Sequence, residues 1–208
     1  HKQSSIIKKG HSSYILKGDF SYGEITNSIA IQTHSNNKKI IKVNGKTIKN
    51  RKEIIGKNNV VVLSPEDQVI TKGGPKERRL FFDRLFSIID IDYLNTLQEF
   101  NRALKQRNAL IFNSKQSEEE SFLPWDEKLS ISAIKLWVIR NKCFIDYFKT
   151  LNKVVSEYQK DLILNVLYIG KTYTKEKFEK KLKQTRERDC LLGTTSYGPH
   201  RDNIKILW

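Results

Sequence analysis

The 208 residues of this chain are 38% hydrophobic and 29% charged, which suffices for one large or two small domains with a buried core. The formal net charge of +15 favours polyanionic partners, above all nucleic acid, although a lysine-rich composition also simply solvates surfaces. No apolar run approaches roughly 18 residues, nothing indicates a secretory signal, and Cys143 and Cys190 have no CxxC partner. These features exclude a membrane or disulfide-rich protein and a zinc site, so we expect a cytoplasmic protein.

Residues 13–63 show a β pattern. The segments SYILKGDF, TNSIAIQTH and KKIIKVN alternate apolar and polar residues, and Asn44-Gly45 is a strong signal for a two-residue hairpin. This pattern predicts a small antiparallel sheet.

A strand-to-helix corner follows the sheet. Val60–Leu63 reads as a buried strand, and Ser64 can cap a helix that begins at Pro65, with Glu66 and Asp67 in its first turn. Such corners commonly carry functional groups.

Two amphipathic helices are then predicted, each with one stripe at helical spacing. The stripe of PKERRLFFDRLFSII consists of Leu80, Phe81, Leu85, Ile88 and Ile89. The stripe of residues 92–112 is partly polar and consists of Leu94, Leu97, Asn101, Leu104, Asn108 and Ile111.

After an acidic linker at residues 113–122, a long helix is predicted to run from Pro124 to about Tyr158. Its repeating apolar positions are Leu129, Ala133, Leu136, Phe144, Tyr147, Leu151, Val154 and Tyr158. A strand at 163–169, a basic helix at 174–192 and a strand at 203–208 complete the pattern.

The stretch LYIGKTYTKEKF has the outline of a phosphate-binding loop but lacks its first glycine. Such a loop needs G-x-x-x-x-G-K-[ST] so that backbone N–H groups can surround phosphates. Asn165 stands five residues before Gly170, and the residues between are bulky and strand-like. VNGKTI fails likewise, because Ile40 stands where the first glycine belongs. The chain therefore contains no nucleotide loop.

Two basic segments are candidates for phosphate binding. Lys76, Arg78 and Arg79 lie near a predicted helix N-terminus, where cations oppose the helix dipole unless a phosphate or a carboxylate is close. The alternative is that Glu77, Asp83 and surface water satisfy these cations.

The segment NRALKQRNAL places Arg102, Lys105 and Arg107 within a turn and a half of helix, suited to following nucleic-acid phosphates. In the alternative, Asn101 and Asn108 make a buried polar contact and the cations are only solvated.

The segment GPHRDN lacks the features of a kinase catalytic loop, since Leu207 replaces the metal-binding asparagine. His200 and Asp202 could form a hydrolase pair, but only Ser196 lies near as a nucleophile, so we do not favour this interpretation.

Five motifs, in this order, resemble the bacterial RecF family of DNA replication and repair proteins, and the resemblance covers essentially the whole chain. They are VVVLSPEDQ, KGGPKERRLFFDR, YLNTLQEFNRALKQRNALI, WDEKL and GPHRDN. The resemblance implies a two-lobed ATPase head similar to those of ABC and SMC proteins, in which ATP and Mg²⁺ close a homodimer. It further implies binding of gapped, duplex and single-stranded DNA, cooperation with RecO and RecR, RecA loading and an SOS role.

In that family the P-loop lies upstream of this segment and the signature and Walker B motifs lie downstream. A chain without methionine that ends in the apolar run IKILW fits an internal segment, which we expect to lack the family's weak DNA-dependent ATPase activity.

The resemblance also assigns two candidate sites. One is a nucleotide-sensing corner formed by Ser64, Glu66 and Asp67. The other precedes the signature helix and is formed by His200, Arg201 and Asp202; Asn203 replaces the usual aspartate, which weakens the match there.

We therefore expect an α+β chain that forms part of a P-loop ATPase head. Residues 1–63 would be antiparallel β, 64–162 an elongated helical lobe, and 163–208 a basic helix and strands returning toward the signature region. The alternative function is a non-enzymatic, basic nucleic-acid-binding helical module.

Overall fold

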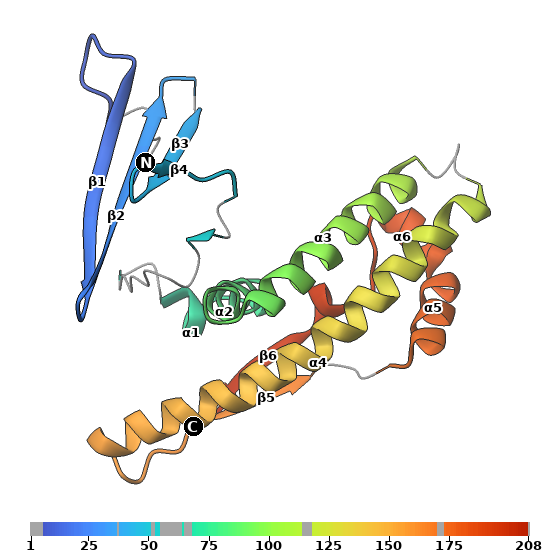
Figure 1. The fold of residues 1–208 in the computed structure, drawn as a ribbon. Helices are drawn as coiled ribbons and strands as arrows, with labels where there is room; N and C mark the ends of the chain where they lie inside the picture. The colour runs from blue at the N-terminus through green and yellow to red at the C-terminus, as the bar shows by residue number, and fades with distance from the viewer. Residues whose placement is uncertain are drawn as a thin grey trace. The chain divides into compact units, whose positions relative to one another are not determined.

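The computed structural model describes residues 6–36, 38–50, 53–54, 64, 68–113, 118–169 and 173–207. The chain divides into two compact units, His1–Val61 and Val62–Trp208, and each is described here by itself (Figure 1).

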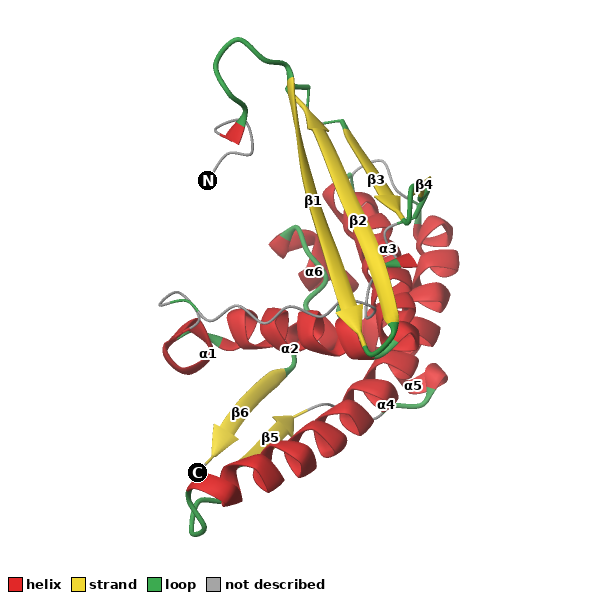
Figure 2. Cartoon of the chain, turned by 60° about the vertical axis from the view of Figure 1, so that its left-hand side comes forward, coloured by secondary structure: helices red, strands yellow, loops and turns green. Residues whose placement is uncertain are grey.

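The first unit is a four-stranded antiparallel sheet in the order β1-β2-β3-β4. Its strands are β1 (Ser13–Tyr22), β2 (Ile25–His34), β3 (Lys39–Val43) and β4 (Lys46–Thr47). Figure 2 shows β1 and β2 as a long ribbon with β3 beside β2. Asn44 and Gly45 both have positive φ, 49° and 79°, as the tight β3–β4 hairpin requires. The predicted sheet and hairpin are thus confirmed, whereas the strand predicted at 60–63 lies outside the described residues.

The second unit is helical and carries a two-stranded sheet. Its elements are α1 (Val69–Lys72), α2 (Pro75–Ile89), α3 (Ile91–Phe112), α4 (Glu119–Tyr158), β5 (Asn165–Ile169), α5 (Lys175–Gln184), α6 (Arg186–Leu192), the 3-10 turn η4 (Pro199–Arg201) and β6 (Asn203–Leu207). In Figure 1, α3 lies along the first part of α4, while β5 and β6 lie along its later part. Together with the sheet of the first unit, these helices give the expected α+β fold.

The core of the second unit is rich in aromatic rings. Phe82 and Phe86 of α2 pack edge-on against Phe144 of α4, with ring centroids 4.8 Å and 5.0 Å apart. The predicted stripe of α2 is correct only in part: Phe81 and Leu85 pack against the core, but Leu80, Ile88 and Ile89 are exposed. Phe82 and Phe86 are four residues apart and form an equally regular stripe. This stripe is the more deeply buried one because it packs against the Phe144 ring of α4.

Helix α3 buries a face close to the predicted one. Leu94 and Ile111 are buried as expected, while Asn101 is exposed. The remaining buried residues of this helix are Tyr93, Phe100, Ala103 and Arg107. A buried arginine on this face was not expected.

Helix α4 begins earlier than predicted, at Glu119, so Pro124 lies inside the helix. Glu119 and Glu120 in the first turn offset the helix dipole, which helps to explain why the acidic linker ends in helix. The predicted end at Tyr158 is confirmed. Leu129, Ala133, Leu136 and Phe144 are buried as predicted, but Val154 and Tyr158 are exposed.

The chain after α4 returns to pack on the helices. β5 pairs with β6 in an antiparallel register that places Tyr168 opposite Ile204. This pairing confirms that Val166–Ile169 is strand; Gly170 to Thr172 lie outside the described residues. The predicted basic helix is broken at Thr185 into α5 and α6.

Candidate functional site

The segment from Gly198 to Asp202 links α6 to β6 and contains three candidate residues of the sequence motif GPHRDN. Gly198 has φ 137° and ψ 179°, a backbone conformation essentially restricted to glycine. A Cβ at this position would also lie 3.2 Å from Nδ1 of His200. Glycine here therefore sets the direction of the turn that carries His200, Arg201 and Asp202.

Arg140 of α4 anchors this segment from one side. Its side chain is 1% exposed, and its Nη1 donates to the carbonyl oxygen of Pro199 at 3.0 Å and to Oδ2 of Asp202 at 3.3 Å. Its Nη2 binds Asp83 at 2.9 Å, and its Nε donates to the hydroxyl of Tyr93 at 2.9 Å. One guanidinium thus joins α2, α3 and α4 to the turn before β6.

Asp202 is held by three side chains at once. Besides Arg140, its Oδ2 accepts hydrogen bonds from Nε1 of Trp137 at 2.8 Å and from the hydroxyl of Tyr168 at 2.6 Å. Burial raises the pKa of Asp202, and the bonds from Tyr168, Arg140 and Trp137 oppose that rise. With three donors on one oxygen, the carboxylate is a structural anchor, because Oδ2 already faces protein groups.

Arg107 of α3 is the centre of a second buried cluster. Its Nε binds Asp126 at 2.7 Å, and its Nη1 binds Asp189 at 2.7 Å and the hydroxyl of Thr195 at 2.8 Å. Its Nη2 donates to the carbonyl oxygen of Leu182 at 3.2 Å. The side chain is fully buried. The prediction that Arg107 contacts nucleic acid is therefore wrong, because its donors are used inside the protein and none faces solvent.

The two clusters meet through Thr195. Its carbonyl oxygen accepts hydrogen bonds from Nε2 of His200 at 2.9 Å and from Nη2 of Arg201 at 3.1 Å. Burial lowers the pKa of His200 to about 4, so the ring is neutral at pH 7. His200 and Arg201 therefore hold the segment against the same residue that Arg107 binds.

The structure does not assemble a hydrolase pair from these residues. The hydroxyl of Ser196 donates to Oδ1 of Asp189 at 2.5 Å, and its backbone N–H donates to the same oxygen at 2.9 Å. His200 instead bonds to the carbonyl oxygen of Thr195. No described contact aligns Ser196 with His200 as nucleophile and base.

Of the predicted nucleotide-sensing corner, Ser64 is described and half-buried, while Glu66 and Asp67 lie outside the described residues. The structure thus neither assembles nor separates these three side chains, and their role stays a prediction.

The cations near the start of α2 differ in their surroundings. Lys76 is exposed. Arg78 donates to the carbonyl oxygens of Ile204 at 2.7 Å and Gly73 at 2.6 Å, and Arg79 donates to that of Asp202. Burial lowers the pKa of Arg79. Backbone carbonyl oxygens of the chain itself therefore bind the guanidinium groups of Arg78 and Arg79, where the sequence analysis expected a phosphate or a carboxylate.

Arg102 and Lys105 of α3 are exposed, as a nucleic-acid contact requires. Arg102 lines a groove of about 350 Å³ between α3 and α4, together with Trp125 and Lys128. The ammonium of Lys128 lies 4.8 Å from the centre of the Trp125 ring.

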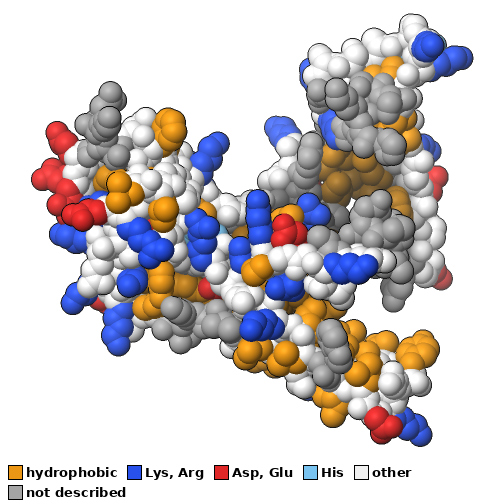
Figure 3. All heavy atoms as spheres, turned by 180° about the vertical axis from the view of Figure 1, so that it is seen from behind, with side chains coloured by type: hydrophobic (Ala, Val, Ile, Leu, Met, Phe, Trp, Pro, Cys, Tyr) orange, Lys and Arg blue, Asp and Glu red, His pale blue; other side chains and the backbone are white. Residues whose placement is uncertain are grey.

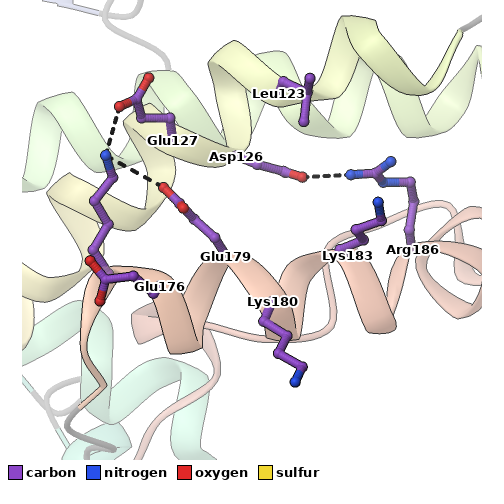
Figure 4. A pocket seen from close by; sticks show the side chains of 9 residues that line it. Leu123, Asp126, Glu127, Glu176, Glu179, Lys180, Lys183 and Arg186 are labelled. Atoms are coloured by element: carbon purple, nitrogen blue, oxygen red, sulfur yellow. Dashed lines mark hydrogen bonds and ion pairs between the residues drawn. The ribbon is translucent and has the colours of Figure 1, made fainter.

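A second hollow, of about 400 Å³, lies between α4 and α5, and Figure 4 shows its lining. Lys175 binds Glu127 at 2.6 Å, and Arg186 binds Asp126 at 2.8 Å. These opposite charges face each other across the hollow, while Lys180 points away from it (Figure 4). Most cations that line this hollow therefore form ion pairs that hold α5 and α6 against α4. This pairing disfavours binding of an anion in the hollow.

Sequence reasoning missed Arg140, Asp189 and Thr195. A signal for Arg140 existed: it stands among buried apolar positions of α4, four residues after Leu136 and four before Phe144. A cation at such a position requires a buried acid. No comparable local pattern marks Asp189 or Thr195.

Within the described ranges, no group of three His, Cys, Asp or Glu side chains could hold a metal ion. Among these same residues, every helix is too short or too polar to cross a membrane.

Comparison with known proteins finds similarity to RecF proteins. The RecF protein of Leptospira interrogans serovar Lai is 33% identical over 209 residues, which cover 99% of this chain and 57% of that protein. The RecF protein of Thermoanaerobacter sp. (strain X514) is 30% identical over 215 residues, covering 99% of this chain and 59% of that protein. Over nearly its whole length the chain is therefore similar to RecF proteins, and these matches support a RecF fragment.

Two solved structures of RecF from the RecFOR pathway are similar to this chain in fold. The RecF-ATPrS structure has a TM-score of 0.86 at 27% identity, and the RecF-ATP structure has 0.85 at 29%. Each match covers all of this chain and 59% or 58% of the other. The chain thus spans less than two thirds of the length of these RecF proteins. No family model matches it.

Proposed function

We propose that this chain is part of a RecF-type DNA replication and repair protein, contributing the antiparallel sheet and the helical lobe of an ATPase head. The observation that carries the proposal is a RecF match that extends over 99% of the chain in sequence and all of it in structure. ATP and Mg²⁺ would be held by the longer protein, whose two copies would close on DNA. That protein would work with RecO and RecR in RecA loading and the SOS response.

In this function the Gly198–Asp202 segment couples the lobes. Arg140 and Thr195 tie it to the helices, and β6 continues directly from it. In RecF proteins the signature region follows this motif, so nucleotide-driven movement of that region would reach α4 through these bonds. Ser64, Glu66 and Asp67 are proposed to sense the nucleotide.

The proposed DNA contacts are the exposed cations Lys76, Arg102 and Lys105. With a net charge of +15, the chain should bind DNA by releasing counterions, so its affinity should fall steeply with salt. Arg107 is excluded from this surface by its burial, and Arg78 and Arg79 are engaged by backbone carbonyls.

Binding of a labelled 25-base-pair duplex by the 208-residue chain, followed by fluorescence anisotropy at several salt concentrations, tests this proposal. Replacing Arg102 and Lys105 by Gln should reduce the slope of log K against log salt by about 0.9 per lost phosphate contact. The matched control replaces Lys177 and Lys180 of α5, which are also exposed, and should leave the slope within error.

Absence of DNA binding at low salt would overturn the proposed function for this part of the protein. An unchanged slope in the Arg102 and Lys105 variant would reject only those two contacts. The alternative, a non-enzymatic nucleic-acid module, is separated by sequencing the flanking DNA: a P-loop upstream and a signature motif downstream support the ATPase, and their absence supports the module. Alone, the 208-residue chain should not turn over ATP.

A further inference from the structure

Helix α4 carries a row of four exposed lysines. Lys128, Lys135, Lys142 and Lys149 are spaced seven residues apart, and we call them the lysine row. Seven residues are nearly two helical turns, so the four side chains share one face, about 10 Å apart, over about 32 Å of helix. The buried residues of α4, such as Leu129, lie on other faces.

All four lysines are exposed, and the described ion pairs leave them out. The lysines that do form ion pairs with described carboxylates are Lys175 and Lys183 of α5. Two carboxylates border the row on α4. Glu127 is already bound to Lys175, and Asp146 forms no described ion pair with Lys142, four residues before it. The row therefore presents four cations that take part in none of the described ion pairs.

The row continues into the groove between α3 and α4. Lys128, its first member, lines that groove together with Arg102 and one carboxylate, Glu99. Arg102 on α3 and the lysines of α4 thus form one track of cations across two helices. Figure 3 shows one face of the molecule, on which Lys and Arg side chains are widely scattered and Asp and Glu side chains are fewer.

A row of exposed aliphatic side chains lies beside the lysines, and it suggests that this face could bind a protein helix instead of nucleic acid. Ile131, Val138 and Ile145 are also spaced seven residues apart and are 40%, 64% and 61% exposed. An acidic amphipathic helix of another protein could cover both rows at once. A second copy of this chain is disfavoured, because each copy carries a net charge of +15.

We propose that the lysine row binds the phosphates of nucleic acid, as a contact additional to Arg102 and Lys105; this inference rests on the proposed DNA-binding function. A row of about 32 Å matches one turn of duplex DNA, about 34 Å. Long, flexible lysine side chains suit a backbone contact that reads no sequence. Nucleic acid needs the lysines alone, whereas a protein helix needs the aliphatic row as well, and this difference separates the two occupants.

The test uses the 208-residue chain, a fluorescein-labelled 25-base-pair duplex and anisotropy titrations from 50 to 200 mM NaCl. The row variant carries Lys135→Gln, Lys142→Gln and Lys149→Gln. The control carries Lys160→Gln, Lys177→Gln and Lys180→Gln, which remove the same charge from exposed positions elsewhere. A third variant, with Val138→Ser and Ile145→Ser, alters the aliphatic row. Circular dichroism melts verify that each variant folds.

The row variant should lose about 0.9 from the salt slope for each phosphate contact removed, while the control and the aliphatic variant keep the slope of the unaltered chain. Equal slopes for the row variant and the control would overturn the inference and leave DNA binding itself intact. Equal losses in the aliphatic and row variants would also overturn it, in favour of a protein-covered face. If the unaltered chain does not bind the duplex at all, that result contradicts the proposed DNA-binding function, and with it the role of the lysine row.

Discussion

Arg107 of α3 and Asp189 of α6 form a 2.7 Å ion pair with both side chains fully buried, although they lie 82 positions apart in the sequence. This pair, with Asp126 on α4, fixes the three helices to one another. A charge buried without its partner is costly, which makes the pair sensitive to removal of either member.

Replacing Arg107 by Met should lower the free energy of unfolding by about 3–5 kcal/mol, because Asp126 and Asp189 would remain buried without their cation. Urea unfolding followed by circular dichroism measures this change. The same substitution at exposed Arg102 is the control and should alter stability by no more than about 0.5 kcal/mol. Similar losses in the two variants would contradict the buried cluster.

Tyr168→Phe should lower the free energy of unfolding by about 1–3 kcal/mol, because Oδ2 of buried Asp202 loses its 2.6 Å hydrogen bond. Thermal and urea unfolding give the value. Tyr158→Phe removes the same hydroxyl from a side chain that is 87% exposed and should have almost no effect. A neutral Tyr168→Phe would mean that Trp137 and Arg140 satisfy the carboxylate alone.

Gly198→Ala should destabilise the chain more than Gly193→Ala. Both glycines have positive φ, 137° and 66°, but an added Cβ at Gly193 meets no atom within 4 Å, whereas at Gly198 it meets the His200 ring. The backbone cost is about 1–3 kcal/mol at each position, and the contact adds to it only at Gly198. Melting temperatures of the two variants provide the comparison, and equal shifts would argue against the close approach.

The free energy of unfolding should fall as the pH is lowered from about 6.5 to about 4 because of His200. Its pKa in the folded chain is lowered from 6.5 to about 4 by burial, so the unfolded chain takes up the proton first. The contribution is up to about 1.4 kcal/mol per pH unit in this window. The raised pKa of Asp202 acts in the opposite direction, because the folded chain then holds that proton more tightly.

Comparison with His200→Gln isolates this contribution, since Asp202 is present in both proteins. The difference in unfolding free energy between the two should shrink steadily from pH 6.5 to pH 4. A difference that stays constant with pH would show that His200 titrates normally.

The β-hairpin at Asn44-Gly45 and the end of α4 were predictable because their signals are local: a turn dipeptide and a helical repeat. The core stripe of α2 was predictable only in part: Phe81 and Leu85 do pack against the core, but the most deeply buried rings, Phe82 and Phe86, are selected by the facing ring of Phe144 on α4. The prediction that Arg107 contacts nucleic acid was wrong for a related reason. Its partners lie 19 and 82 residues away, so neighbouring cations Arg102 and Lys105 made it resemble a surface residue.

The motif was enough to predict the candidate segment, but it did not predict which side chains bind that segment. GPHRDN drew attention to His200, Arg201 and Asp202, whereas Arg140, which binds Asp202, lies 62 positions earlier. Such a pairing depends on how α4 and β6 are brought together, and that is a property of the tertiary fold.

Helix α4 is a single 40-residue element held at two separated places, at Asp126 by Arg107 and at Arg140 by Asp202. A rod fixed at two points cannot pivot about either one. Displacement of the turn before β6 therefore acts on both fixed points of the rod at once, because moving α4 at Arg140 also pulls on the buried pair at Asp126.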